Sequence, residues 1–99
     1  MAVMDIQVLP LGTCSTSLSG LIVEAVKVVK ASGLMHELTP MGTVVEGEMD
    51  ELLALAKAMH EAVIAAGAAR VMTTIQIDDR RDKKLSMARK VQSVREKLP

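Results

Sequence analysis

Two short polar segments contain the residues best suited to bind a ligand. Residues 11–17 include Gly12, Thr13 and Ser15, and they connect a predicted strand to a predicted helix. A helix start exposes unpaired backbone N–H groups, and hydroxyl side chains add donors and acceptors at the same place. Residues 40–48 have a similar mixture of small, hydroxyl and carboxylate side chains. This chemistry favours binding of a small polar molecule, although the first segment alone is also typical of a well-capped helix.

The second segment contains an unusual carboxylate. Thr43 supplies a hydroxyl group, and Glu46 falls within a predicted strand, where carboxylates are disfavoured. Glu37 lies on the strand that is predicted to pair with it, so the two acids are expected near one another. Two neighbouring carboxylates would balance a cationic ligand or accept hydrogen bonds from an amino group. A charged edge strand that blocks unwanted pairing explains the same residues, so both interpretations stay open.

The sequence predicts no catalytic residues. Cys14 lies in a strand-to-helix loop, but no arginine follows it before Arg70 and no histidine is near enough in sequence to act as its base. His36 and His60 are the only histidines, whereas a zinc site needs three or four ligands at matched spacing. We therefore expect a non-catalytic protein that has no metal site and requires no cofactor.

Composition narrows the possible partners. The 99 residues fit one domain, residues 1–99, and 49% of them are apolar. No aromatic residue is present, which excludes an aromatic platform for stacking bases and argues against nucleic acid. No apolar run approaches the ~20 residues of a membrane span, and no secretory leader is recognisable. We expect a cytoplasmic protein that binds neither nucleic acid nor membrane.

Hydrophobic periodicity predicts the elements that hold the two polar segments. Alternating residues indicate strands over 2–9 and 70–77, and two shorter strands near 34–39 and 43–48 are joined by a Pro-Met-Gly turn. Helical spacing indicates one helix ending at about Ser32, a second stopped by Gly67, and a third from about Lys84 to Lys97. The order β-α-β-β-α-β predicts an α+β ferredoxin-like plait with an additional C-terminal helix.

The uncovered face of this sheet and the C-terminal segment both suggest contact with another subunit. The face is too apolar for a purely solvated surface, yet it carries Asp5, Gln7, Thr74 and Gln76. Residues 78–99 carry eight basic and four acidic side chains, whereas the preceding residues carry four basic and eight acidic ones. The C-terminal helix is therefore either a solvated helix or a segment that docks on an acidic neighbour.

The charged turn at residues 78–82 allows two interpretations. Its three aspartates and two arginines, Arg80 and Arg81, form either local ion pairs or a clamp between subunits. Exposed pairs contribute only ~0–1 kcal/mol each, so stability alone is a weak reason for them.

Three motifs in order resemble a known family. They are residues 10–13, Pro-Leu-Gly-Thr, before a serine-rich helix start; residues 41–47, which contain Met-Gly-Thr and Glu-Gly; and residues 77–80, Ile-Asp-Asp-Arg. Together, across nearly the whole chain, they are similar to the small YkoF-like proteins that bind thiamine or hydroxymethylpyrimidine.

The resemblance implies a ferredoxin-like plait that pairs through its sheets and forms a homotetramer, a dimer of dimers. It also implies a non-catalytic role in binding thiamine or its pyrimidine half. Carried over by position, Gly12, Thr13, Thr43 and Glu46 would face the ligand, and Ser15 and Glu37 complete the expected set. With no aromatic residue available, Met41, Met72 or a peptide plane would contact the pyrimidine ring.

Other functions share this topology. An ACT-like regulatory module would bind an amino acid or another small metabolite at a subunit interface, usually beside an enzyme domain on the same chain. An RNA-recognition module would normally carry aromatic residues on its central strands. A small enzyme would need a base and a nucleophile that meet only in the fold.

Overall fold

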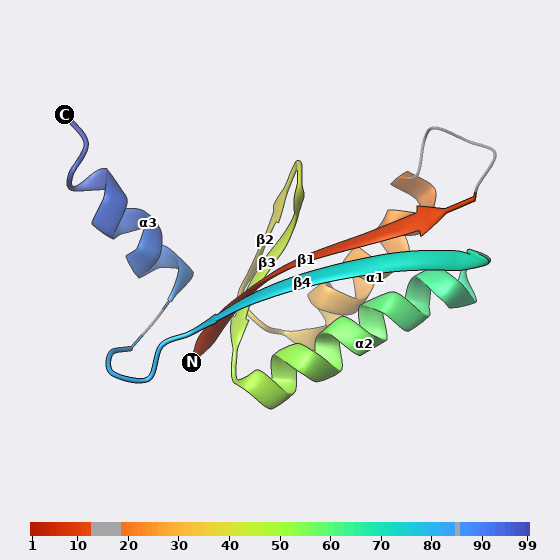
Figure 1. The fold of residues 1–99 in the computed structure, drawn as a ribbon, viewed down its shortest axis with the longest axis horizontal. Helices are drawn as coiled ribbons and strands as arrows, with labels where there is room; N and C mark the ends of the chain where they lie inside the picture. Colours follow the sequence, from red (N-terminus) through yellow and green to blue (C-terminus); the bar gives the residue numbers. More distant parts are fainter. Residues whose placement is uncertain (13–18, 85) are drawn as a thin grey trace.

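The computed structural model describes residues 1–12, 19–84 and 86–99, which form four strands and three helices. The elements in chain order are β1 (Ala2–Leu11), α1 (Ser19–Ser32), β2 (His36–Thr39), β3 (Gly42–Gly47), α2 (Met49–Ala65), β4 (Arg70–Asp79) and α3 (Met87–Arg95). The strands form one antiparallel sheet in the order β2-β3-β1-β4 (Figure 1). This arrangement confirms the predicted α+β ferredoxin-like plait with an additional C-terminal helix.

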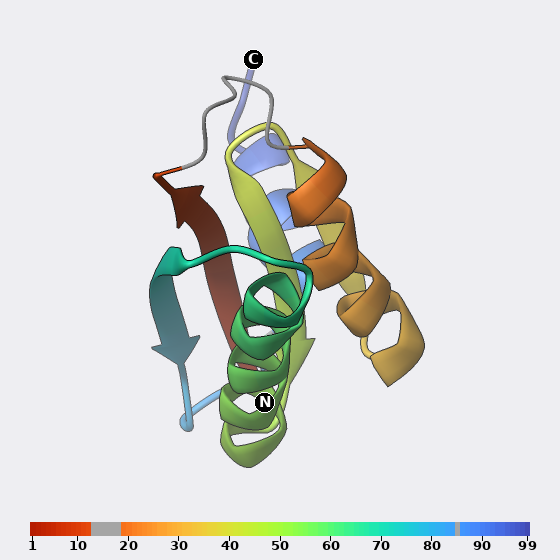
Figure 2. The ribbon, with the colours of Figure 1, turned by 90° about the vertical axis from the view of Figure 1, so that its right-hand side faces the viewer.

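One face of the sheet is covered by α1 and α2, which lie side by side (Figure 2). Alternate residues of β1 point into this core, from Ala2 through Met4, Ile6 and Val8, because successive strand residues face opposite sides. The helices contribute the apolar stripes expected from their spacing, including the fully buried Val29, Leu52 and Val63. We call the opposite, uncovered side of the sheet the open face.

At Gly42, where β3 begins, β3 lies closer to β1 than a side chain would permit. A Cβ atom on Gly42 would lie 2.8 Å from the carbonyl oxygen of Ile6 and 3.1 Å from a carboxylate oxygen of Asp5. Glycine is therefore required there by close approach of two backbones.

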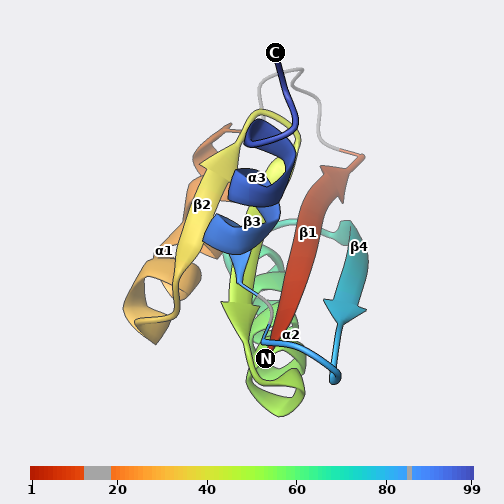
Figure 3. The same ribbon diagram turned by 90° about the vertical axis from the view of Figure 1, so that its left-hand side faces the viewer.

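The third helix differs most from the sequence expectation. It begins at Met87 because Ser86 is its N-cap, and the Ser86 hydroxyl accepts a hydrogen bond of 3.1 Å from the Arg89 N–H. The helix projects from one end of the sheet (Figures 1 and 3). Its apolar stripe stays exposed: Val91 is 46% exposed, Val94 60% and Leu98 63%.

Within the described part of the chain, no helix combines the length and apolar character needed to cross a membrane.

Candidate ligand-binding site

A cavity of about 280 Å³ lies under the β2–β3 turn, between the sheet and α1. Its walls are mostly apolar and come from β1, α1, α2 and the turn itself, and Ile6, Val26 and Met59 are among them. Among the described residues, Gln7, Thr39 and Thr43 are the polar ones that line it, and Thr43 is the one whose side chain points to the helix side of the sheet. Small-molecule sites generally have this composition, with a few polar groups placed on an apolar wall.

Thr43 places a hydroxyl group inside this apolar wall. It pairs with Ile6 of β1 and points to the helix side of the sheet, in the same row as Val45 and Gly47. Its side chain is only 4% exposed, and it is the one residue among the described buried set that is polar. A hydroxyl group both donates and accepts hydrogen bonds, so its place in an apolar wall suits recognition of a polar group.

Three hydrogen bonds hold the turn over the cavity. The Thr39 hydroxyl donates to the Gly42 carbonyl at 2.8 Å and accepts from the Met41 N–H at 3.3 Å. The Gln7 side-chain amide donates to the Met41 carbonyl. Met41 itself lines the cavity, whereas Met72 lies on β4 and does not. Of the two methionines expected to contact a ring, Met41 is the one that lines this cavity, and it is 75% exposed.

Glu46 points away from this cavity and contacts α3. Thr43 and Glu46 are three residues apart on one strand, so their side chains leave opposite faces of the sheet. The Glu46 Oε2 atom accepts a hydrogen bond of 2.8 Å from the Met87 N–H in the first turn of α3. A carboxylate at a helix start also interacts favourably with the helix dipole. Within one chain, the structure does not bring Glu46 and Thr43 into one cavity.

The row of residues around Glu46 forms the attachment site of α3. Glu46, Val3 and Asp78 are neighbours across β3, β1 and β4 on the open face. Val3 is buried there, and the Lys90 ammonium group pairs with the Asp78 carboxylate. The attachment therefore involves the first turn of α3 and leaves the rest of its apolar stripe exposed.

The remaining predicted site residues are spread along the molecule. Glu37 is exposed on the open face, where it pairs with Val44 and is one diagonal step from Glu46. Such diagonal neighbours are about 7–8 Å apart, so the two acids are near one another. Neither of them lines the cavity. Gly12 has a φ of 73° just after β1, a backbone conformation that glycine adopts without strain. Thr13 and Ser15 lie outside the described residues.

Sequence reasoning missed Gln7 and Thr39 as lining residues of the cavity. Gln7 was assigned to the open face by alternation, yet its amide reaches the turn of the neighbouring hairpin. Thr39 precedes the Pro-Met-Gly turn, and a hydroxyl at that position commonly bonds to the turn backbone. The position of Thr39 just before the turn could therefore have predicted its contact with the turn backbone.

The two histidines have structural contacts. His60 Nδ1 lies 2.7 Å from the Thr73 hydroxyl, and His36 Nδ1 lies 2.9 Å from the Leu34 carbonyl. Among the described residues, no group of three or more histidine, cysteine or acidic side chains is placed to hold a metal ion.

A second, polar hollow of about 640 Å³ lies at the opposite end of β1, beside the charged turn. Arg80 pairs with Asp82 at 2.7 Å, and Arg81 pairs with Asp79 at 2.8 Å. The hydrogen bond from Arg80 lowers the pKa of the Asp82 carboxyl group and raises the pKa of Arg80. These contacts are local ion pairs within the turn, the first of the two interpretations.

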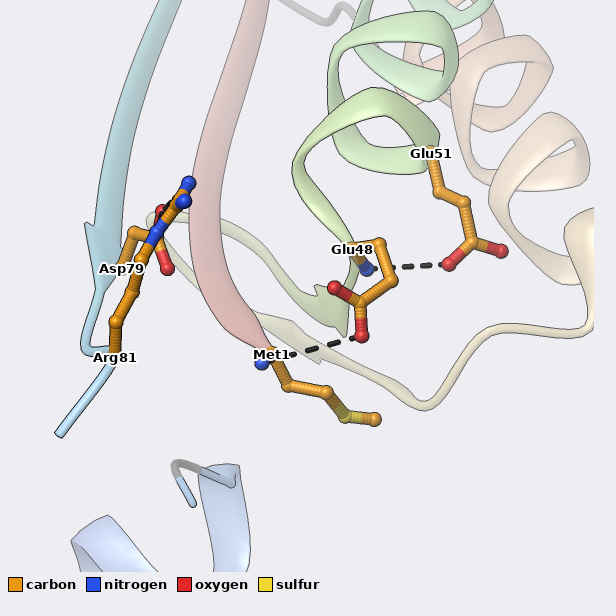
Figure 4. A network of polar contacts seen from close by, with 5 residues as sticks. All are labelled: Met1, Glu48, Glu51, Asp79 and Arg81. Atoms are coloured by element: carbon orange, nitrogen blue, oxygen red, sulfur yellow. Dashed lines mark hydrogen bonds and ion pairs between the residues drawn. The ribbon is translucent and has the colours of Figure 1, made fainter. Parts of the chain in front are cut away.

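Figure 4 shows the neighbouring contacts at this end of the sheet. The Met1 ammonium group lies 3.9 Å from the Glu48 carboxylate, and the Glu48 N–H donates to Glu51 at 3.1 Å. The latter contact satisfies a free N–H at the start of α2. Several of the groups that line the hollow therefore already have partners in helix capping and ion pairing.

Comparison with known proteins adds independent information on this fold. The family model described as "Thiamine-binding protein" matches residues 4–95. A UPF0045 protein of Methanothermobacter thermautotrophicus is 50% identical over 95 residues, which cover 95% of this chain and 96% of the relative. The UPF0045 protein YqgV of Bacillus subtilis is 41% identical and covers 99% of this chain and 98% of its own length.

Two solved structures have the same fold. The crystal structure of a hypothetical protein of Methanocaldococcus jannaschii has a TM-score of 0.88 and 35% identity, with 96% of each chain covered. A structure from Thermotoga maritima has a TM-score of 0.80 and 24% identity, and it covers 94% of this chain and 97% of its own. The latter protein carries a suggested role in thiamine biosynthesis or salvage.

Proposed function

Because this chain belongs to the thiamine-binding protein family, we propose that it binds thiamine or its hydroxymethylpyrimidine half in the cavity under the β2–β3 turn. The observation that carries this proposal is an apolar cavity of about 280 Å³ with the buried Thr43 hydroxyl in its wall. The volume is just below the usual range for small-molecule sites, roughly 300–1,000 Å³. It suits one substituted ring better than a whole two-ring vitamin.

The chemistry of the lining favours the pyrimidine half. No charged side chain lines the cavity among the described residues, so the permanently cationic thiazolium ring would lose its hydration there without compensation. An aminopyrimidine is neutral and offers both donors and acceptors. The Thr43 hydroxyl provides one donor and two acceptor positions that complement such a ring.

Isothermal titration calorimetry with a matched pair of variants tests this site. Thr43→Val keeps the shape of the side chain and removes its hydroxyl group, so one neutral hydrogen bond worth ~0.5–1.5 kcal/mol is lost. We expect hydroxymethylpyrimidine to bind about 2- to 10-fold more weakly. Thr74→Val makes the same change on the exposed open face and should leave affinity unchanged.

The same titration separates the competing functions. Wild-type protein that binds neither thiamine nor hydroxymethylpyrimidine contradicts the proposal, and a response to amino acids instead supports an ACT-like module.

We propose a non-catalytic role that needs no cofactor, so mass spectrometry should recover the bound ligand chemically unchanged. We propose the cytoplasm as the compartment, which cell fractionation measures.

We also propose that the chain forms a homo-oligomer, as a dimer of dimers, with the open faces and α3 at its interfaces. The exposed stripe of Val91, Val94 and Leu98 needs an apolar partner. The open face offers Leu9 and Met72 as exposed apolar side chains. Its acidic residues complement the excess of basic residues over 78–99.

Native mass spectrometry tests this assembly. Val94→Asp places a charge within the exposed stripe and should shift the protein towards smaller species. Ser93→Asp places the same charge on the other side of α3 and should leave the subunit number unchanged. A wild-type monomer at micromolar concentration contradicts the proposed assembly.

A further inference from the structure

A trough along α1 adjoins the candidate cavity. The trough is a hollow of about 450 Å³ between α1 and β2, and it shares Ile22, Val26 and Leu38 with the cavity. Figure 3 shows α1 running beside β2. Leu38 therefore lines both the smaller cavity and the larger trough. A ligand with a ring in the cavity could extend past Leu38 along the helix.

The trough has an apolar floor and two ammonium groups on its lining. Val23 and Val26 contribute to the floor, while Lys27 and Lys30 are both exposed on α1. The described residues that line the trough include no carboxylate. Glu24, which does not line the trough, pairs with Lys27 at 3.1 Å and neutralises part of the positive charge of Lys27. Lys30 follows Val26 by one helical turn and is the second positively charged residue of the trough.

We infer that the physiological ligand carries an anionic group on the side that leaves the cavity, and that a phosphate monoester of the aminopyrimidine is its chemical class. This inference rests on the proposed function, because the cavity must first hold the ring. A phosphate group in the trough would be attracted by Lys27 and Lys30. A thiazolium cation in the same place would be repelled by them, so free thiamine is the poorer fit.

The inference predicts a salt-dependent preference that calorimetry can measure. At low ionic strength, hydroxymethylpyrimidine phosphate should bind about threefold to tenfold more tightly than hydroxymethylpyrimidine, since exposed ion pairs are individually weak. Raising the salt concentration to about 0.5 M shortens the screening length to a few ångströms and should remove most of this difference. Inorganic phosphate alone should bind much more weakly than the ester, because it lacks the ring.

A charge-neutral variant identifies the groups responsible. The double variant Lys27→Gln with Lys30→Gln should lose the preference for the ester and bind the unphosphorylated ring as the wild type does. Lys57→Gln removes one exposed ammonium group from α2, away from the trough, and should keep the preference. Circular dichroism checks that each variant is folded, because Lys30 also lies in the last turn of α1.

The possible outcomes separate this inference from the proposed function. Equal affinity for ester and ring overturns the inference and leaves the proposed function standing, as does a preference that survives in the double variant. Comparable binding of inorganic phosphate also overturns the inference. Folded wild-type protein that binds neither compound overturns both.

Discussion

Replacing Glu46 with glutamine should loosen α3 and leave the cavity intact. The Glu46 carboxylate accepts the Met87 N–H at 2.8 Å, on the face of the sheet opposite to Thr43. Glutamine keeps an acceptor oxygen but removes the negative charge. The change therefore isolates the charge-dependent part of the contact.

The magnitude follows from the kind of hydrogen bond that is lost. A hydrogen bond to a charged group contributes ~1.5–3 kcal/mol and a neutral one ~0.5–1.5 kcal/mol. The difference is about 1 kcal/mol, and partial exposure of Glu46 reduces it further through solvent screening. We expect the population of detached α3 to rise roughly two- to fivefold.

Amide hydrogen exchange measures this population residue by residue. The amides of the first turn of α3, from Met87 to Lys90, should exchange faster in Glu46→Gln, while core amides of β1 should not change. Glu37→Gln is the matched control, because Glu37 is an exposed carboxylate on the same face of the neighbouring strand. Calorimetry on the same variant should show unchanged affinity for hydroxymethylpyrimidine.

The opposite result would refute the role assigned to Glu46. If α3 exchanges at the wild-type rate and thiamine binds more weakly with the melting temperature unchanged, Glu46 contacts the ligand. That is the behaviour expected from the sequence resemblance. The two readouts together decide between an anchor for α3 and a ligand contact.

Two further changes test the surroundings of the site. Gly42→Ala should destabilise the protein by more than 1 kcal/mol in chemical denaturation, because its Cβ would lie 2.8 Å from the Ile6 carbonyl oxygen and force the strands apart; an unchanged midpoint would contradict this packing. Arg80→Gln should raise the pKa of the Asp82 carboxyl group towards its ordinary value, because the hydrogen bond from Arg80 is the main cause of its lowering. Since Asp82 has a lowered pKa in the folded protein, its pairing with Arg80 stabilises the folded state at neutral pH, and that effect is lost on acidification. Identical NMR titrations of Asp82 in the wild type and in Arg80→Gln would contradict the pairing.

Much of the fold could be predicted because its signals are local. The alternation of Met4, Ile6 and Val8 indicated the buried face of β1 directly, and the structure buries these residues. The helix stripes are likewise set by spacing within each helix. Element boundaries were predicted less accurately than the elements themselves. For example, β2 begins at His36 rather than near residue 34.

The grouping of the candidate site could not be predicted in the same way. The resemblance placed Thr43 and Glu46 in one ligand-facing set, although strand alternation over three residues assigns them to opposite faces. The contact between Glu46 and Met87 spans 41 positions in the chain, and no local pattern encodes such a pairing. The cavity itself depends on how the β2–β3 turn meets α1, which is a tertiary property.

The contact between Glu46 and the first turn of α3 makes Met87 the pivot of this helix. A helix of nine residues is about 13 Å long, so a small rotation about Met87 moves Leu98 a considerable distance without disturbing the body. In the proposed oligomer, substitutions near this pivot would therefore alter the spacing and orientation of neighbouring subunits and leave the proposed ligand cavity unchanged.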